Sequence, residues 1–139
     1  MAFITKDDLG QDIYDEILNG VTRADDSKIQ TACNEAQAEI DGYICARYDS
    51  GDLFAKTGDG RNKTILAIAR TIAIYKLNKV CNTMTELRRI DYEDAIKTLD
   101  KIQSGKFILS GAKLTGQTDE TIPETQVSAI SNPKRTNYF

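Results

Sequence analysis

The stretch Thr64–Leu77, TILAIARTIAIYKL, constrains the fold of this chain more than any other, because it is apolar on nearly every side. A helix that is apolar all round must be covered all round by other parts of the protein. The stretch is also shorter than the roughly 20 residues that a helix needs to span a bilayer, and it contains Arg70. We therefore expect a soluble, intracellular protein in which residues 63–81 form the central helix of a small bundle.

Two further long helices are predicted on either side of this central helix. Asp25 and Asp26 precede a segment with apolar residues at spacings of three and four, which predicts a helix over about residues 27–47. Another helix is predicted over about residues 86–104, with Gly105 just after its end. The apolar stripes are Ile29, Ala32, Cys33, Ala36, Ile40, Tyr43 and Ile44 in the first helix, and Leu87, Ile90, Ala95, Ile96, Leu99 and Ile102 in the second.

The remaining segments complete the predicted organisation. Short helices are expected over about residues 6–10 and 12–18, the second ended by Asn19-Gly20. Residues 48–62 contain three glycines and three aspartates, which predicts a loop. The expected fold class is all-α: a small bundle of three main helices plus one or two short N-terminal helices over residues 1–109, then an extended C-terminal arm over residues 110–139.

The arm ends in an unusual combination of basic and aromatic side chains. Residues 126–130 contain two β-branched side chains, Val127 and Ile130, enough to predict a short strand. Residues 132–139 follow, and disordered ends usually have a plainer composition. We interpret them as an anchoring tail that inserts into a partner, the alternative being an unstructured end. The candidate partner-binding residues are Lys134, Arg135, Asn137, Tyr138 and Phe139.

The sequence contains no pattern that predicts catalysis or cofactor binding. It has no histidine, and the aspartates of residues 48–62 lack the spacing of a calcium-binding loop. Glycine-rich phosphate loops and serine-nucleophile motifs are also absent from the sequence. A net charge of −3 and a pI near 5.0 provide no basic field for nucleic acid. We therefore expect no enzyme activity, no metal and no cofactor.

An arginine, a glycine and two cysteines lead to structural predictions. Arg70 interrupts an apolar helix, and a buried guanidinium is costly unless it is paired. We therefore predict a structural ion pair for Arg70, with a carboxylate of its own chain or of a neighbouring subunit. Gly42 lies within a helix, where glycine costs about 1 kcal/mol relative to alanine, so we expect another backbone to approach closely there. Cys33 and Cys81 fall on apolar helical faces and are expected to be small buried side chains.

Three ordered segments resemble one protein family. They are Glu39–Tyr43 followed by Arg47-Tyr48, then Ile72–Leu77, then Tyr92–Lys97. Their order and spacing, together with Ile4–Leu9 at the start, resemble the Mu-like head–tail connector proteins of tailed phages over about residues 3–109. The segment Ser131–Asn137 also resembles the end of versions carried by prophages of the Bacteroides group.

The resemblance implies a structural adaptor with no catalytic residue and no cofactor. Such connectors look like small helical domains that assemble as a ring, here expected to be twelvefold, beneath the portal protein of the capsid. The implied partners are the portal protein and the next tail or head-closure component, while DNA passes through without specific binding and no membrane is involved. The implied location is the head–tail junction of the virion, and the host cytoplasm during assembly. The alternative is a small helical regulatory or nucleic-acid-binding protein.

Overall fold

The apolar stretch forms helix α5, Lys63–Val80, on which the other long helices pack. The computed structural model describes residues 3–115. The side chain of Asn62 starts α5 by accepting a hydrogen bond from the backbone N–H of Ile65 at 3.1 Å. The buried residues of α5 come from most of its circumference, as predicted for a central helix: Ile65, Leu66, Ile68, Ala69, Ile72, Ala73, Ile74, Leu77 and Asn78.

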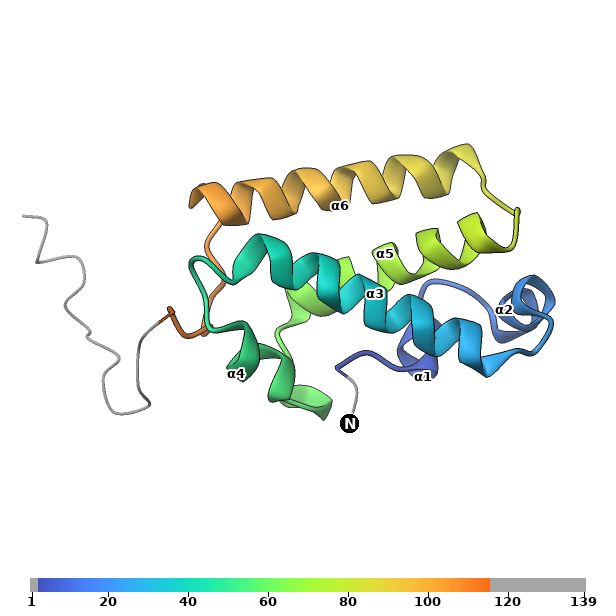
Figure 1. The fold of residues 1–139 in the computed structure, drawn as a ribbon, viewed down its shortest axis with the longest axis horizontal. Helices are drawn as coiled ribbons and strands as arrows, with labels where there is room; N and C mark the ends of the chain where they lie inside the picture. The colour runs from blue at the N-terminus through green and yellow to red at the C-terminus, as the bar shows by residue number, and fades with distance from the viewer. Residues whose placement is uncertain (1–2, 116–139) are drawn as a thin grey trace, which may run out of the picture.

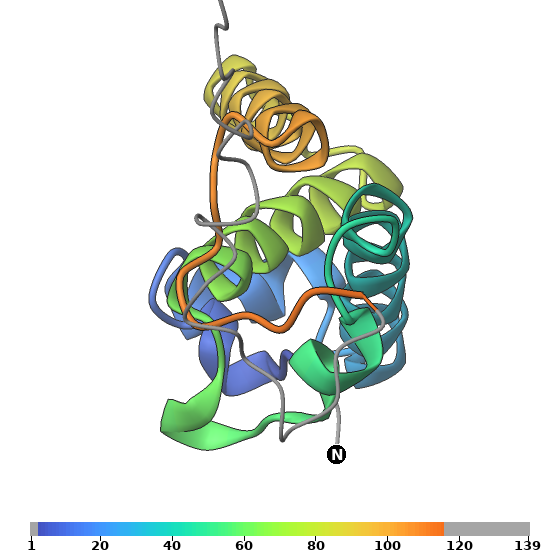
Figure 2. The same cartoon turned by 90° about the vertical axis from the view of Figure 1, so that its left-hand side faces the viewer.

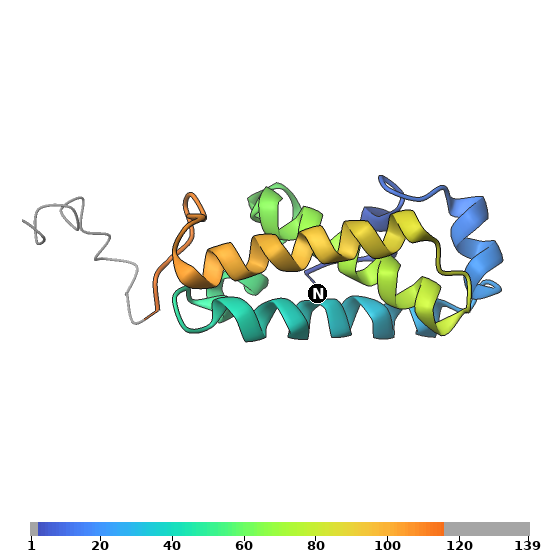
Figure 3. The same ribbon diagram turned by 90° about the horizontal axis from the view of Figure 1, so that it is seen from above.

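Helices α3, Asp26–Ile44, and α6, Glu86–Ser104, cover α5. Both run antiparallel to α5, and together the three helices form a layered bundle with α6 on the outside (Figures 1 and 3). Asp25 caps α3 by accepting from the N–H of Ser27, and Thr85 caps α6 by accepting from the N–H of Arg88. Residues 3–115 form helices and connecting segments and contain no strand, so the predicted all-α class is confirmed.

Glycine at position 105 ends α6 because of its backbone conformation. Its φ of +84° lies in the left-handed region that side chains disfavour. A Cβ built at Gly105 would lie 2.8 Å from Nη1 of Arg47, so the flexible end of that side chain would have to move. By contrast, a Cβ at Gly42 would have no heavy atom within 4 Å. The predicted close approach of another backbone at Gly42 is therefore wrong, because this glycine lies on an exposed part of α3.

The two short N-terminal helices are α1, Lys6–Leu9, and α2, Asp15–Thr22. The prediction that Asn19-Gly20 ends the second helix is wrong, because α2 continues for two residues beyond Gly20. Thr22 is fully buried, and its hydroxyl donates to the carbonyl oxygen of Leu18 at 2.8 Å, which keeps the last turn helical. The left-handed backbone of Arg23 and Ala24 then ends the helix.

The segment predicted as a loop over residues 48–62 contains helix α4, Ser50–Ala55, and the 3₁₀ helix η1, Gly58–Gly60. Asp49 is not a turn residue but the cap of α4, since its side chain accepts from the N–H of Asp52 at 3.1 Å. Leu53 is buried, and the ring of Phe54 meets the ring of Phe3 edge-on. Leu53 and Phe54 thus pack this short, otherwise largely polar helix on the core.

After α6 the chain crosses the end of the bundle and is held there by hydrogen bonds (Figure 2). The N–H of Leu109 donates to the hydroxyl oxygen of Tyr48 at 3.1 Å, and Leu109 is buried. Tyr48 and Leu114 form an isolated antiparallel bridge, so the backbone is paired with the bundle through Thr115. The predicted strand over residues 126–130 and most of the predicted arm lie outside the described residues. Within residues 3–115, no helix is both long and apolar enough to cross a membrane.

Candidate functional site

A carboxylate on α3 connects the three long helices. Glu39 Oε2 lies 3.1 Å from Nζ of Lys76 on α5, and the hydroxyl of Tyr92 on α6 donates to Glu39 Oε1 at 2.6 Å. The rings of Tyr75 and Tyr92 stack, with centroids 3.9 Å apart and planes 9° from parallel. We call Glu39, Tyr75, Lys76 and Tyr92 the interhelical cluster. The three segments that carry the family resemblance meet at this point.

The charges and hydrogen bonds of the interhelical cluster favour a role in holding the helices together over a role in proton transfer. Burial of the Tyr92 phenol, and secondly its hydrogen bond to Glu39, raise the pKa of Tyr92 well above its ordinary value. Tyr92 therefore remains a hydrogen-bond donor throughout the physiological range. Glu39 is opposed by the ammonium of Lys76, and both of these side chains are largely shielded from solvent. Glu39, Lys76 and Tyr92 all lie in the three segments that carry the family resemblance. Their spacing in the sequence, however, does not show that these side chains contact one another across helices.

Replacing Tyr92 with phenylalanine tests this cluster. Tyr92→Phe removes the hydroxyl that donates to Glu39, so the free energy of unfolding should fall by about 1 kcal/mol. Tyr92→Ala should cost more, about 3 kcal/mol, because the ring and its stacking are lost as well. Urea unfolding of the purified chain measures both. Tyr14→Phe is the matched control, since Tyr14 is 78 % exposed and should change nothing. Equal effects of Tyr92→Phe and Tyr14→Phe would contradict the assignment.

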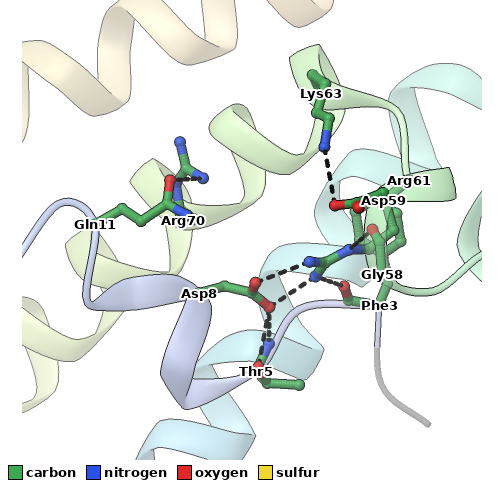
Figure 4. Close-up of polar contacts among 9 residues, drawn as sticks. All are labelled: Phe3, Thr5, Asp8, Gln11, Gly58, Asp59, Arg61, Lys63 and Arg70. Atoms are coloured by element: carbon green, nitrogen blue, oxygen red, sulfur yellow. Dashed lines mark hydrogen bonds and ion pairs between the residues drawn. The ribbon is translucent and has the colours of Figure 1, made fainter.

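A second ion pair holds the N-terminal segment to η1 (Figure 4). Arg61 binds both carboxylate oxygens of Asp8, with Nη1 2.8 Å from Oδ2 and Nη2 3.0 Å from Oδ1. The same guanidinium donates to the carbonyl oxygens of Phe3 and Gly58. Asp8 also accepts from the N–H of Thr5, which closes the start of α1. Both charged side chains are mostly buried, so this pair is a structural contact and not a solvated surface pair.

The charge of Asp8 makes this contact sensitive to acid. Burial alone would raise the pKa of Asp8, but the hydrogen bonds from Arg61 and Thr5 lower it below the ordinary 3.8. A lowered pKa in the folded state means that the stabilisation is present above pH 3.8 and is lost as the pH falls through the folded value. The contact therefore contributes fully at neutral pH.

We expect Asp8→Asn to lower the free energy of unfolding at pH 7 by about 2 kcal/mol, because Arg61 is left without its counter-ion. The variant should also lose less stability than the wild-type chain when the pH falls below 4, since its side chain does not titrate. Thermal unfolding measured across this pH range checks both results. Asp7→Asn, on the exposed neighbouring residue, is the control. An unchanged acid dependence in Asp8→Asn would refute the role given to Asp8.

Arg70, the charged residue of the central helix, has its partners in its own chain. Its Nε lies 3.1 Å from Oδ2 of Asp12, and its Nη1 donates to Oε1 of Gln11 at 3.0 Å. The side chain of Arg70 is 16 % exposed, so the guanidinium lies at the edge of the core and reaches the connection between α1 and α2. The choice between a carboxylate of the same chain and one of a neighbouring subunit is thus decided by the fold.

The other predicted residues are placed as follows. Cys33 is buried as predicted, and burial raises the pKa of its thiol to about 11, whereas Cys81 is only half-buried. Among residues 3–115, no group of three or more potential ligands could hold a metal ion. The predicted anchor residues lie outside the described part of the chain: Lys134, Arg135, Asn137, Tyr138 and Phe139.

The predicted apolar stripe of α6 is wrong in its N-terminal half. Ala95, Leu99 and Ile102 are buried against the bundle, but Leu87 is 65 % exposed and Ile90 is 42 % exposed. The last residue of α5 and the turn that follows add two more exposed apolar side chains. We call these four residues the hairpin patch: Val80, Met84, Leu87 and Ile90. Exposed apolar side chains of this kind are available for contact with another molecule.

The fold and these contacts define a small all-α domain whose buried polar side chains connect its helices. A family model described as Bacteriophage Mu, Gp36 matches residues 3–128. The Mu-like prophage FluMu protein gp36 of Haemophilus influenzae is 33 % identical over 102 residues, which cover 70 % of this chain and 61 % of that protein. The chain therefore belongs to the Gp36 family of Mu-like phages, and the predicted family is confirmed. The resemblance to Bacteroides-group prophages stays a prediction.

Proposed function

We propose that this chain is a structural head–tail connector of a Mu-like phage. It assembles as a twelvefold ring beneath the portal protein and extends the DNA channel toward the tail. Its partners are the portal protein and the next tail or head-closure component, and it performs no enzymatic reaction. The observation that carries the proposal is membership of the Gp36 family over residues 3–128, because that family belongs to Mu-like phages and supports a structural or assembly role.

The chemistry of the described residues supports this function. The shielded ion pairs connect elements of the fold: Glu39 with Lys76, Asp8 with Arg61, and Arg70 with Asp12. A groove of about 580 Å³ lies between α3 and α4, but polar and small side chains line much of it, among them Asn34, Gln37, Ser50 and Gly51. These features suit a rigid building block that presents surfaces to neighbours.

The alternative, a regulatory or nucleic-acid-binding protein, has less support. Helix α6 carries Arg88 and Arg89, but Arg89 is paired with both Glu86 and Glu93 on the same helix. A recognition helix would need its cations free to reach phosphates and bases. Retention on heparin or duplex DNA that falls steeply with salt would favour this alternative over the connector.

Deletion of the gene from an inducible prophage tests the connector. Without the chain, we expect DNA-filled heads and separate tails in place of complete virions, and an intact copy supplied in trans should restore joining. Electron microscopy with antibody labelling of wild-type virions should place the chain at the head–tail junction. Joined, infectious particles at normal yield from the deletion strain would exclude the proposed function.

A further inference from the structure

The groove between α3 and α4 contains a carboxylate that the described part of the chain leaves unpaired. Asp41 is the only charged residue among those that line this groove, and the amides of Asn34 and Gln37 and the hydroxyl of Ser50 lie beside it. Within residues 3–115, Oδ1 of Asp41 is buried without a hydrogen-bond donor, and no ion pair joins this carboxylate to a cation. A partly buried charge is costly until an opposite charge approaches it.

The other carboxylates close to the groove already have partners. Asp49 caps α4 by accepting from the N–H of Asp52. The carboxylate of Asp52 lies 3.7 Å from the ammonium of Lys56 and 3.6 Å from that of Lys113. The uncompensated negative charge of this region is therefore that of the groove itself. Together with the amide and hydroxyl oxygens, which accept hydrogen bonds, it suits an ammonium or guanidinium group.

The described chain stops beside this groove (Figures 1 and 2). Thr115 donates from its N–H to the carbonyl oxygen of Arg47 and from its hydroxyl to that of Cys45, each at 3.0 Å. The N–H of Cys45 in turn donates to the carbonyl oxygen of Asp41, so these two residues lie one helical turn apart on the same face of α3. The segment after Thr115 thus leaves the described fold about one turn, roughly 5 Å, from the level of Asp41.

Residues 116–139 supply the matching charge. Lys134 and Arg135 are the only basic residues of this segment. The chain from residue 116 to Lys134 can extend to about 65 Å, far beyond what a return to the adjacent groove requires. A covalent tether of this kind raises the concentration of the two cations at the groove to the order of millimolar. This favours the chain's own segment over that of a second copy at ordinary protein concentrations.

We propose that the groove between α3 and α4 binds Lys134 and Arg135 of the same chain, with the carboxylate of Asp41 as their counter-ion. The cation neutralises the unpaired charge and donates to the amide oxygens that line the groove. The contact also holds Tyr138 and Phe139 near one end of the bundle, which lowers the entropy cost of their binding to a partner. It is a property of the isolated chain and does not require the connector function.

Intramolecular cross-linking of the full-length chain tests this contact. Cys45 is an exposed thiol one turn from the carboxylate of the groove, and Cys33 is buried. In a Cys81→Ser background, one chain carries Thr136→Cys and another carries Ser128→Cys. Dilute protein is treated with a short bis-maleimide. Intact mass and peptide mapping then measure the link from Cys45 to each new cysteine.

The two positions distinguish a bound tail from a tail that is only tethered. A freely moving tail would link Ser128→Cys about twofold more than Thr136→Cys, because the shorter loop closes more readily. Binding of the adjacent Lys134 and Arg135 in the groove should reverse this order. The expected result is therefore a higher yield from Thr136→Cys, as an intramolecular link within one chain.

Charge variants then assign the contact to its residues. Asp41→Asn removes the charge and keeps the shape of the side chain, so it should lower the Thr136→Cys yield by about fivefold. Replacing Lys134 and Arg135 together with glutamine should lower the yield equally. Asp7→Asn, on an exposed carboxylate of α1, is the control and should leave the yield unchanged. Circular dichroism checks that each variant is folded.

Three results would overturn the inference. The first is a yield from Thr136→Cys that stays below that from Ser128→Cys. The second is a yield that neither Asp41→Asn nor the glutamine variant lowers. The third is a set of covalent dimers in place of the intramolecular link, which would assign the groove to the tail of a second copy. The test uses only the purified chain, so its failure is distinct from a failure of the connector function in the gene deletion.

Discussion

Removal of residues 132–139 should abolish the joining of heads to tails while the helical circular-dichroism signal stays intact. The buried core among the described residues extends from Phe3 to Leu109. The removed segment holds the predicted anchors, two of them aromatic and two basic. Loss of two aromatic anchors at about 2 kcal/mol each would weaken partner binding by on the order of 1000-fold. Complementation of the deletion strain, scored by infectious particles, measures the effect.

A full-length variant separates anchoring from chain length. Lys134, Arg135, Tyr138 and Phe139 are replaced together by serine, and this chain should fail as completely as the truncation. Thr118→Ala with Gln126→Ala, in the same arm, is the matched control and should support normal assembly. Normal particle yield from the serine variant would show that the tail is not the anchor.

Replacement of Ile72 with alanine should cause the largest loss of stability. Ile72 lies in the middle of α5 and is fully buried. Removing its larger side chain leaves a cavity in the packed centre of the bundle, which costs about 3–4 kcal/mol. A domain of this size has a total stability of about 5–15 kcal/mol, so the substitution should remove a large fraction of it. Chemical denaturation followed by circular dichroism gives the difference.

The same substitution on an exposed isoleucine provides the control. Ile108→Ala should change the free energy of unfolding by less than about 0.5 kcal/mol, since Ile108 makes little contact with the core. If both variants lost the same amount, α5 would not be the centre of the folding unit. A change of residue type alone would then explain the result.

Much of the fold could be predicted from local pattern. The helix bounds of α5 and α6 follow from apolar spacing and from the capping residues Asn62, Thr85 and Gly105. These features act within one or two turns of chain, so they can be read without knowing the neighbours. The same local rules failed at residues 48–62 and at Asn19-Gly20. At residues 48–62, the burial of Leu53 and the contact of Phe54 with Phe3 outweighed the turn-forming composition, and at Asn19-Gly20 the burial of Thr22 and its hydrogen bond to Leu18 did so.

The interhelical cluster and the hairpin patch could not be predicted from residue spacing, because both depend on how the helices pack. Glu39, Tyr75 and Tyr92 are far apart in the sequence, and only the packing of α3, α5 and α6 brings them together. Leu87 and Leu99 belong to the same predicted apolar stripe of α6, yet Leu99 is buried and Leu87 is 65 % exposed.

The sequence by itself therefore determined that the chain is helical, that Thr64–Leu77 lies at its centre and that its segments resemble a Mu-like phage family. These properties depend on the order and spacing of neighbouring residues, which can be read directly from the sequence. The tertiary structure decided which carboxylate pairs with Arg70 and which apolar side chains stay in solvent. Those properties depend on distances between residues that are remote in the chain, and such distances exist only once the helices have packed.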